Sequence, residues 1–392
     1  MSRIKVLHLV KWYPNKDEPL LGIFVKKQIQ SLQNHCDQKV MAIVLSDDIH
    51  ANFVRVENDV NQLKEVVYYH KKGLLNKLRV MWEIWKEAKQ FQSQITHAHV
   101  LGWTSILAYF LQIKNKSPFL ASEHWSGYRN NHFHKKSFLS KILIKKSAHK
   151  AQQIHVVSDF LKKDMLKCGI QANYKSIGNV VNGKAFILEK NKPFTFVFAG
   201  DLIQETKNVK GILEAFEAVL QTNNDIRLDI IGDGKDSTYY KELSGKLKLN
   251  SHVYFHGNQS NDYVFKILSQ SHALILNSYF ETFSVICAEA LLCGIPVIST
   301  RCGGPESFLT MDTGILIESD NTKELTKAMY SLIENYVTYE PEKLKRVAAK
   351  FSSEVIGKKI HQEYLNILNG DSSGSGKIKS KKSDLRSIAN HL

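Results

Sequence analysis

Short apolar segments rich in β-branched residues alternate with helical patterns along most of this chain. In the first half such segments lie at 5–10, 39–45, 95–100, 118–122 and 153–157. In the second half they lie at 194–199, 226–231, 252–255, 273–276, 296–299 and 314–317. The intervening residues 24–32 and 78–91 repeat their apolar positions at a spacing near 3.6, which predicts amphipathic helices. Strands that alternate with helices are typical of βαβ units on a parallel sheet.

A polar stretch at 189–193 separates the two series of predicted strands. A chain of 392 residues is too long for one ordinary core and about right for two domains of typical size. We therefore predict an α/β fold of two doubly wound halves that face each other across a cleft. Helical patterns continue from 340 to 368, and the Lys- and Ser-rich residues 370–392 are predicted to form a disordered basic tail.

Composition and cysteine spacing restrict the class of protein. With 43% hydrophobic and 23% charged residues, the chain has the composition of a soluble globular protein, and its first residues show no secretory signal pattern. No apolar run approaches the roughly 18 residues that a membrane-spanning helix needs. The five cysteines have no metal-ligand spacing, so we expect a reduced cytoplasmic protein without structural zinc.

The positive charge is concentrated in the first part of the chain. Residues 1–150 hold 24 Lys and Arg against 11 Asp and Glu, a net +13, whereas residues 151–369 hold 24 against 25, a net −1. No zinc-finger, RNP or helix-turn-helix pattern accompanies the basic part, so we do not expect nucleic acid as a partner. Within 130–150 lysines alternate with apolar residues, which fits either a solvated basic helix or an interfacial helix on an anionic membrane.

Two glutamates, Glu281 and Glu289, stand out in the apolar segment 278–307. Residues 274–277 are predicted as a strand and 283–293 as the helix after it, so one glutamate lies at the strand exit and the other about two turns further on. Ligands of doubly wound sheets bind outside the carboxyl ends of the strands, often against a helix N-terminus. We therefore expect the backbone N–H groups of Phe283, Ser284 and Val285 to be free to bind an anion.

These residues allow two interpretations. Glu289 has apolar or small sequence neighbours, and a charge in such surroundings needs a partner. The two carboxylates would then hold the ends of an extended polar ligand with an anion between them, which is the shape of a nucleotide sugar. The alternative is that Glu281 is only a partner of the helix dipole and Glu289 a solvated helix residue.

This segment resembles the E-x7-E region of the retaining glycosyltransferases of family 4, which have the two-domain GT-B fold. Further motifs follow the family's order: Gly200-Asp-Leu-Ile203 with Lys207-Asn208, Ile230-Ile-Gly-Asp-Gly234, Val253-Tyr-Phe-His-Gly257, and Pro296-Val-Ile-Ser-Thr300 with Gly303-Gly-Pro-Glu306. We expect an N-terminal acceptor-binding domain at 1–188 and a C-terminal donor-binding domain at 189–350. The helix at 351–369 is expected to cross back to the first domain.

The resemblance implies a role for each matching residue of the second half. Glu289 matches the glutamate that binds the donor ribose, and Glu281 matches the one that contacts the donor sugar. Lys207 matches the lysine that neutralises the diphosphate, and Gly200 matches the glycine of the phosphate loop. The arginine that usually follows this glycine is replaced by Asp201.

Other candidates come from loops after predicted strands. Gly22 matches a glycine-containing loop that faces the donor phosphates, although a glycine alone is usually a turn. His124 matches the histidine that reaches the donor sugar, although a lone histidine is more often structural. Asn258 opens a polar turn that could cap the next helix or be a plain loop. In the family that the chain resembles, the matching loop approaches the base through its backbone. His97 and His99 share one face of a strand, and we expect packing for His97 and leave an acceptor-side role open for His99.

The sequence therefore predicts a retaining glycosyltransferase with catalytic residues Glu281, His124 and Lys207. The donor would be a nucleotide-diphosphate sugar, UDP-linked before GDP-linked, with no cofactor and no required metal. The acceptor would be a hydroxyl of a glycan or lipid-linked saccharide in cell-surface polysaccharide or glycolipid biosynthesis, at the inner face of the cytoplasmic membrane. A sugar-nucleotide epimerase of similar fold and a non-catalytic nucleotide-sugar binding protein are the alternatives.

Overall fold

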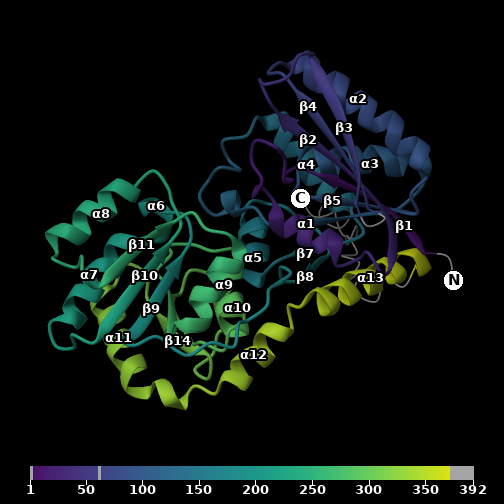
Figure 1. The fold of residues 1–392 in the computed structure, drawn as a ribbon. Coiled ribbons are helices and arrows are strands. Elements are labelled where there is room, and N and C mark those ends of the chain that lie inside the picture. The colour runs from purple at the N-terminus through teal and green to yellow at the C-terminus, as the bar shows by residue number, and fades with distance from the viewer. Residues whose placement is uncertain (1–2, 61–62, 371–392) are drawn as a thin grey trace, which may run out of the picture.

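The computed structural model describes residues 3–60 and 63–370, which form two α/β lobes, as Figure 1 shows. The N-lobe holds an eight-stranded sheet in the order β3-β4-β2-β1-β5-β6-β7-β8. The C-lobe holds a six-stranded sheet in the order β11-β10-β9-β12-β13-β14. All strand pairs of these sheets are parallel except the antiparallel β3–β4 pair. The predicted disordered tail lies outside the described residues from 371 onward.

The N-lobe elements follow the predicted alternation. Its strands are β1 Ile4–Val10, β2 Cys36–Leu45, β3 Phe53–Val60, β4 Leu63–His70, β5 Ile95–His99, β6 Phe119–Glu123, β7 Ile154–Val156 and β8 Tyr174–Ser176. Its helices are α1 Ile23–Gln30, α2 Leu74–Phe91, α3 Trp103–Asn115, the 3-10 turn η1 Ser126–Tyr128, α4 Phe138–Lys150 and α5 Asp159–Lys167. The predicted strands at β1, β2, β5, β6 and β7 and the helices at α1 and α2 are confirmed.

The sequence pattern does not predict β3 and β4, because charged residues interrupt their apolar alternation. Glu65 of β4 is buried, and its carboxylate accepts a hydrogen bond from Tyr13 Oη at 2.5 Å and pairs with Lys26 Nζ at 3.0 Å. On the edge strand β3, Arg55 pairs with Glu57 at 2.6 Å. The partners of Glu65 lie far away in sequence, so a local pattern cannot show that this charge fits a strand.

The C-lobe elements confirm the predicted second series. Its strands are β9 Phe194–Ala199, β10 Ile226–Ile231, β11 Val253–Gly257, β12 Ala273–Leu276, β13 Val297–Thr300 and β14 Gly314–Ile317. Its helical elements are α6 Gln204–Lys207, α7 Val209–Leu220, α8 Ser237–Lys246, α9 Asn261–Gln270, α10 Val285–Leu292, η2 Gly304–Ser307, α11 Thr322–Asn335 and η3 Tyr336–Thr338. The last helical run divides into α12 Pro341–Ala349 and α13 Ser353–Asn369, because Ser352 caps α13 by accepting from Val355 N.

Helix α13 returns to the N-lobe and lies beside β1 (Figure 1). Its buried residues Ile356, Ile360 and Tyr364 join a hydrophobic cluster with Ile4 and Val6 of β1. The Tyr364 hydroxyl also lies 2.6 Å from Nδ1 of buried His97 on β5. These contacts attach α13 to the first sheet, while the exact domain limits given above stay a prediction.

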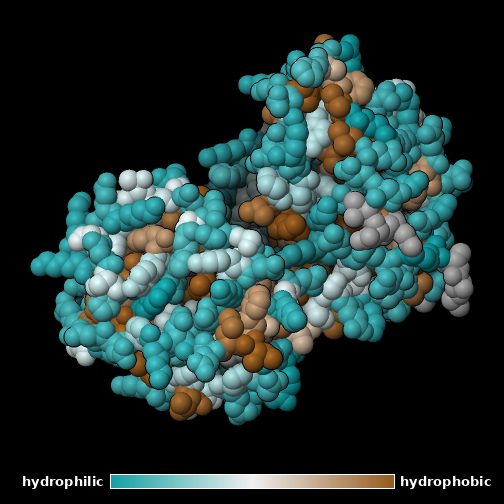
Figure 2. All heavy atoms as spheres, viewed as in Figure 1, coloured by the Kyte–Doolittle hydropathy of each residue, from teal (hydrophilic) through white to brown (hydrophobic). Residues whose placement is uncertain are grey.

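The carboxyl ends of the two sheets meet at the junction of the lobes. Ser158, just after β7, donates a hydrogen bond to the carbonyl of Thr282 at 2.7 Å. Arg129, after η1, donates to the carbonyl of Cys302 at 2.7 Å. Figure 2 shows the hollowed face between the lobes. A ligand in this hollow would reach loops from both sheets, which is where doubly wound folds place their sites.

The cysteines and helices agree with a globular interior. All five cysteines are buried and free, and they pack as small core residues. Among the residues that the structure describes, no helix has the length and apolarity to cross a membrane.

We expect Tyr364→Phe to lower the free energy of unfolding by about 1 to 3 kcal/mol, because it leaves Nδ1 of His97 buried without its partner. Urea unfolding at pH 7 measures this change. Tyr254→Phe is the matched control, since its exposed hydroxyl donates only to the Ser251 carbonyl among the residues that the structure describes. Equal stability of the two variants would contradict the anchoring role of this contact.

Candidate active site

Glu281 is held in the loop between β12 and α10. Its backbone N–H donates to the Cys302 carbonyl at 2.9 Å, and its own carbonyl accepts from Gly304 N at 2.9 Å. Its side-chain Oε1 lies 2.5 Å from Lys207 Nζ and accepts from Ser278 Oγ at 2.9 Å. Backbone and side-chain contacts together fix this carboxylate at the strand exit that the sequence predicted.

Lys207 is the last residue of α6, and its side chain is mostly buried beside Gly200. Burial alone would lower the pKa of Lys207, but the ion pair with Glu281 and the nearby Asp201 raise it above its ordinary value. The lysine is therefore positively charged at neutral pH. Sequence motifs and structure agree in bringing Lys207 and Glu281 together, although they are 74 residues apart.

Glu289 lies in the second turn of α10 and is only 5% exposed. Its Oε1 is 3.8 Å from Nζ of Lys27 on α1 of the N-lobe, and within the described residues neither of its carboxylate oxygens accepts a hydrogen bond. Burial raises the pKa of Glu289 to about 7, and Lys27 partly opposes that rise. The idea of a solvated helix residue is wrong, because this is a nearly buried carboxylate with unused hydrogen-bonding capacity.

The start of α10 supplies the expected backbone groups in part. The side chain of Phe283 is buried against Phe308 and Phe351, so only its backbone could reach a ligand. Gly304 packs against the backbone nitrogen of Phe283. Ser284 has a left-handed φ of 70°, and its hydroxyl oxygen lies 3.3 Å from Sγ of Cys287. Val285 is the first residue of the helix. The first N–H groups of a helix have no acceptor within it, so an anion can bind there.

Three glycines lie next to one another at the carboxyl ends of the neighbouring strands β9, β10 and β11. Gly200 N donates to the Ile231 carbonyl at 3.0 Å, and Gly232 N donates to the Gly257 carbonyl at 2.8 Å. A Cβ on Gly232 would lie 2.0 Å from the Gly200 carbonyl oxygen, so this close approach excludes a side chain. Asn258 follows as an exposed loop residue, and Ser260 rather than Asn258 caps α9.

On the N-lobe, Gly22 caps α1 with a left-handed φ of 66°. A Cβ at this position would lie 2.1 Å from the Trp12 carbonyl oxygen, so the glycine is needed first for packing of its own loop. Phe24 in the first turn of α1 packs against His124, with ring centroids 4.8 Å apart and the ring planes tilted by 43°. Gly22 therefore contributes by placing the start of α1 beside His124.

His124 is buried directly after β6. Among the described residues neither ring nitrogen has a partner in good hydrogen-bond geometry, although the Asn179 side chain lies close to the ring. Burial lowers the pKa of His124 to about 4, with a smaller opposing effect from Asn179, so the ring is neutral at pH 7. A buried neutral imidazole with unmet polar atoms next to the junction is available for a ligand.

Sequence reasoning missed Glu123, the residue that positions this loop. One of its carboxylate oxygens accepts from the N–H groups of His124 and Trp125 at 2.8 and 2.9 Å. The other accepts from Leu101 N at 2.9 Å and Tyr128 Oη at 2.7 Å. The signal was the polar residue at the end of an otherwise apolar strand, but its partners are visible only in the fold.

Three buried histidines lie close enough together to be compared with a metal site. The ligand atoms of His8, His97 and His99 lie within 4.8 Å of one another. However, the rings of His97 and His99 stack at 4.1 Å with 24° between their planes, so their in-plane lone pairs cannot converge on one ion. In addition, Nε2 of His8 is hydrogen-bonded to Gln38, and Nε2 of His97 is hydrogen-bonded to Ser122. The cluster fits a neutral hydrogen-bonded network inside the sheet.

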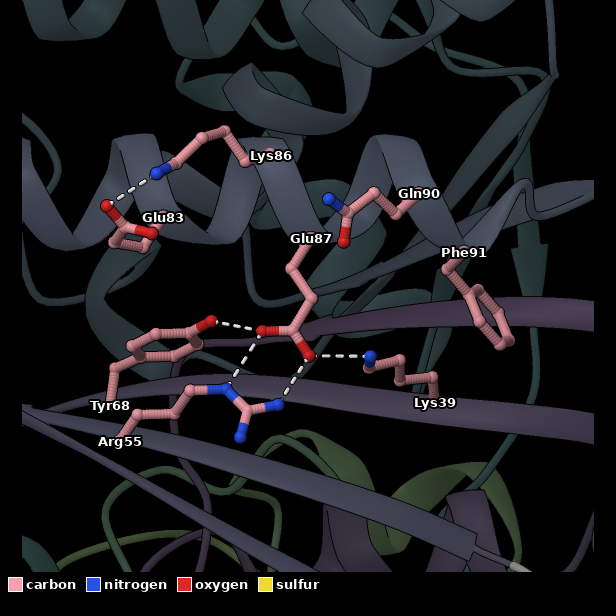
Figure 3. Close-up of a pocket in the computed structure, with 8 residues that line it drawn as sticks. All are labelled: Lys39, Arg55, Tyr68, Glu83, Lys86, Glu87, Gln90 and Phe91. Atoms are coloured by element: carbon pink, nitrogen blue, oxygen red, sulfur yellow. Dashed lines mark hydrogen bonds and ion pairs between the residues drawn. The ribbon is translucent and has the colours of Figure 1, made fainter.

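A depression of about 470 Å³ between α2 and β2, β3 and β4 is occupied by an internal charge network (Figure 3). The carboxylate of Glu87 accepts two hydrogen bonds from Arg55 at 3.0 and 2.7 Å and pairs with Lys39 at 2.6 Å. Tyr68 also donates to it. Burial would raise the pKa of Glu87, but these partners lower it to about 2. The carboxylate is satisfied within the protein, so this network braces α2 on the sheet.

Comparisons with known proteins agree with this geometry. Residues 32–183 match the model described as Glycosyltransferase Family 4, and residues 181–351 match that described as Glycosyl transferases group 1. HepE from Anabaena, solved in complex with UDP, has the same fold with a TM-score of 0.71 and 16% identity over 93% of this chain and 100% of its own.

Two curated relatives match part of the chain. N-acetyl-alpha-D-glucosaminyl L-malate synthase from Bacillus anthracis is 30% identical over 44% of this chain and 45% of its own length. Lipopolysaccharide 1,6-galactosyltransferase from Salmonella typhimurium is 32% identical over 39% of this chain and 44% of its own. The chain thus spans less than half the length of these relatives. Because the two family models adjoin and the two facing lobes have the GT-B fold, the chain belongs to the family 4 glycosyltransferases.

Proposed function

We propose that this protein transfers a sugar from a nucleoside-diphosphate sugar to a hydroxyl group of a saccharide acceptor, with retention of the anomeric configuration. The observation that carries the proposal is the Lys207–Glu281 pair at 2.5 Å, placed at the strand exit in front of α10. A fixed cation next to free helix N–H groups suits a diphosphate leaving group. The nearby carboxylates suit the hydroxyl groups of the two sugars.

Each residue has a distinct part in this proposal. Lys207 stabilises the negative charge that develops on the departing diphosphate. Glu281 accepts hydrogen bonds from hydroxyl groups of the reacting sugar, and Glu289 accepts them from the ribose. His124 contacts the sugar from the N-lobe, so both lobes are needed to complete the site. The departing phosphate takes the acceptor proton, the acceptor attacks from the side that the phosphate leaves, and no metal is required.

A UDP-sugar is the first donor to test and a GDP-sugar the second. The fold neighbour HepE was solved with UDP, which supports this order. The related lipopolysaccharide 1,6-galactosyltransferase supports a role in the synthesis of a cell-surface glycan. Incubation with UDP-sugars distinguishes the alternatives, since transfer or slow hydrolysis releases UDP, an epimerase isomerises the donor, and a binding protein leaves it unchanged.

We also propose that the N-lobe contacts an anionic membrane through α4. Phe138, Leu139 and Ile142 on this helix are 77%, 66% and 43% exposed. Lys146 and Lys150 follow at helical spacing and are also exposed. Exposed apolar side chains flanked by lysines are the arrangement with which an interfacial helix binds lipid, and this surface would bring a lipid-linked acceptor to the enzyme.

We expect Glu289→Ala to weaken UDP binding by about 10- to 150-fold, because it removes a charged acceptor worth about 1.5 to 3 kcal/mol. Glu281→Ala should retain most UDP affinity and lose sugar transfer. Calorimetry with UDP and release of UDP from a UDP-sugar measure the two effects. Glu242→Ala, an exposed carboxylate on α8, is the control. Unchanged affinity and turnover in both site variants would refute the assignment.

The UDP affinity should also fall as the pH drops below 7, by up to about tenfold per pH unit. Burial raises the pKa of Glu289 to about 7, and its ionised form is a much stronger hydrogen-bond acceptor than its protonated form. Proton uptake therefore competes with UDP at low pH and not above pH 8. In Glu289→Gln this component should disappear, leaving the titration of UDP itself. The same pH profile in both proteins would rule out this role for Glu289.

For the membrane surface, we expect wild type to sediment with vesicles that contain anionic phosphatidylglycerol and not with neutral vesicles. Glu substitution of Lys135, Lys146 and Lys150 should abolish this binding at physiological salt, since each lysine near the surface contributes about 1 kcal/mol. The control carries three exposed lysines of the C-lobe changed to Glu: Lys241, Lys246 and Lys248. Equal sedimentation of the two variants would disprove the α4 contact.

A further inference from the structure

A second depression lies on the N-lobe at the carboxyl ends of β1, β2 and β4. Its volume is about 510 Å³, and Lys11, Lys72 and Lys77 line it together with apolar side chains. Lys11 follows β1, and the other two lysines lie just before and within the first turn of α2. This is the edge of the N-terminal sheet that faces the junction, where a doubly wound domain binds its ligand.

The lysines of this pocket have no compensating carboxylates. Within the part of the chain that the structure describes, none of Lys11, Lys72 and Lys77 forms an ion pair, and no acidic side chain lines the pocket. Elsewhere in the N-lobe, Lys26 pairs with Glu65 at 3.0 Å and Lys39 with Glu87 at 2.6 Å. The uncompensated charge is therefore a local property of the pocket.

Lys11 connects the pocket to the candidate active site. Its Nζ lies 5.1 Å from the Trp12 ring and 5.3 Å from the Trp125 ring, and Lys136 Nζ lies over the same Trp125 at 4.8 Å. Trp125 directly follows His124 in the chain. Burial lowers the pKa of Lys11. The negative charge of Glu123 raises this pKa, and the positive charges of Lys136 and Lys77 lower it further.

Glu123 does not neutralise the pocket by direct contact. Both of its oxygens already accept hydrogen bonds from the backbone N–H groups and the tyrosine that it positions. The nearest interactions of Lys11 are with the two indole rings, which attract a cation but leave its N–H groups available. A bound anion would therefore meet several unused donors.

Apart from His70 at the end of β4, the remaining side chains of the pocket are apolar. Ile43, Leu45 and Trp103 line it, and Leu74 at its rim is 73% exposed. Leu75, the next residue of α2, is 72% exposed. Apolar side chains at the mouth of a cationic pocket suit a ligand whose anionic group is joined to a hydrocarbon chain.

We propose that this pocket binds a phosphate group of the acceptor, between Lys11, Lys72 and Lys77, and that the exposed leucines contact the chain that carries it. The inference rests on the proposed function, because it identifies the acceptor of that same site as a phosphate-bearing one. The phosphate could belong to a lipid-linked saccharide or to a free sugar phosphate. The apolar rim favours the lipid-linked acceptor.

Calorimetry with short probes tests the proposal, with saturating UDP present so that the donor site is filled. The probes are octyl phosphate, glucose 1-phosphate and octyl glucoside, which separate the phosphate from the alkyl chain. We expect octyl phosphate to bind at least about tenfold more tightly than octyl glucoside. Tighter binding than that of glucose 1-phosphate assigns the lipid-linked source, and equal binding of the two phosphates supports the site but assigns a soluble acceptor.

Variants of the pocket make the test specific. Lys72→Gln with Lys77→Gln should lose about tenfold in octyl phosphate affinity, and adding Lys11→Met should lose more. The control is Lys114→Gln with Lys116→Gln on exposed positions at the end of α3. All variants should bind UDP as wild type does. Octyl phosphate binding that is weak, or equal in pocket and control variants, overturns this inference, whereas failure of wild type to bind UDP overturns the proposed function instead.

Discussion

The ion pair between Lys207 and Glu281 fixes the loop on which the junction of the lobes depends. The 2.5 Å contact joins the end of α6 to the loop after β12, and the Glu281 backbone bonds at the same time to residues after β13. Thr282 and Cys302, held in this way, offer the carbonyls that accept the hydrogen bonds of Ser158 and Arg129 from the N-lobe. The residues proposed to bind the donor therefore also set how the two lobes meet.

The core of the N-lobe holds neutral polar groups, although the N-lobe carries most of the net positive charge of the chain. Inside the N-terminal sheet, His8, His97 and His99 are buried and neutral, because burial lowers the pKa of each ring. His8 hydrogen-bonds to Gln38 and to His99, and His97 hydrogen-bonds to Ser122 and Tyr364. No Lys or Arg is among the buried residues that the structure describes, so the positive charge of the N-lobe lies outside its core.

The sequence predicted what depends on local pattern and missed what depends on distant partners. Strands such as β1 and β9 were predicted because they are buried on both faces, which gives runs made mostly of apolar residues. The β3–β4 hairpin was missed because the buried Glu65 depends on Tyr13 and Lys26. In the site, the motifs identified Glu281, Glu289 and Lys207. They did not identify Glu123 or Lys27, since neither residue has a signal until the fold brings its partners to it.

The Glu289–Lys27 contact links the protonation of the site to the position of the lobes. The two charges are 3.8 Å apart on α10 and α1, and the glutamate is nearly buried without a hydrogen bond in the described residues. An ionised Glu289 attracts the N-lobe through Lys27, whereas a protonated Glu289 does not. Ribose hydroxyl groups would stabilise the ionised form, because they supply the donors that burial removed. Binding of a donor in the proposed pose would thus strengthen the attraction that holds α1, and with it His124, against the C-lobe.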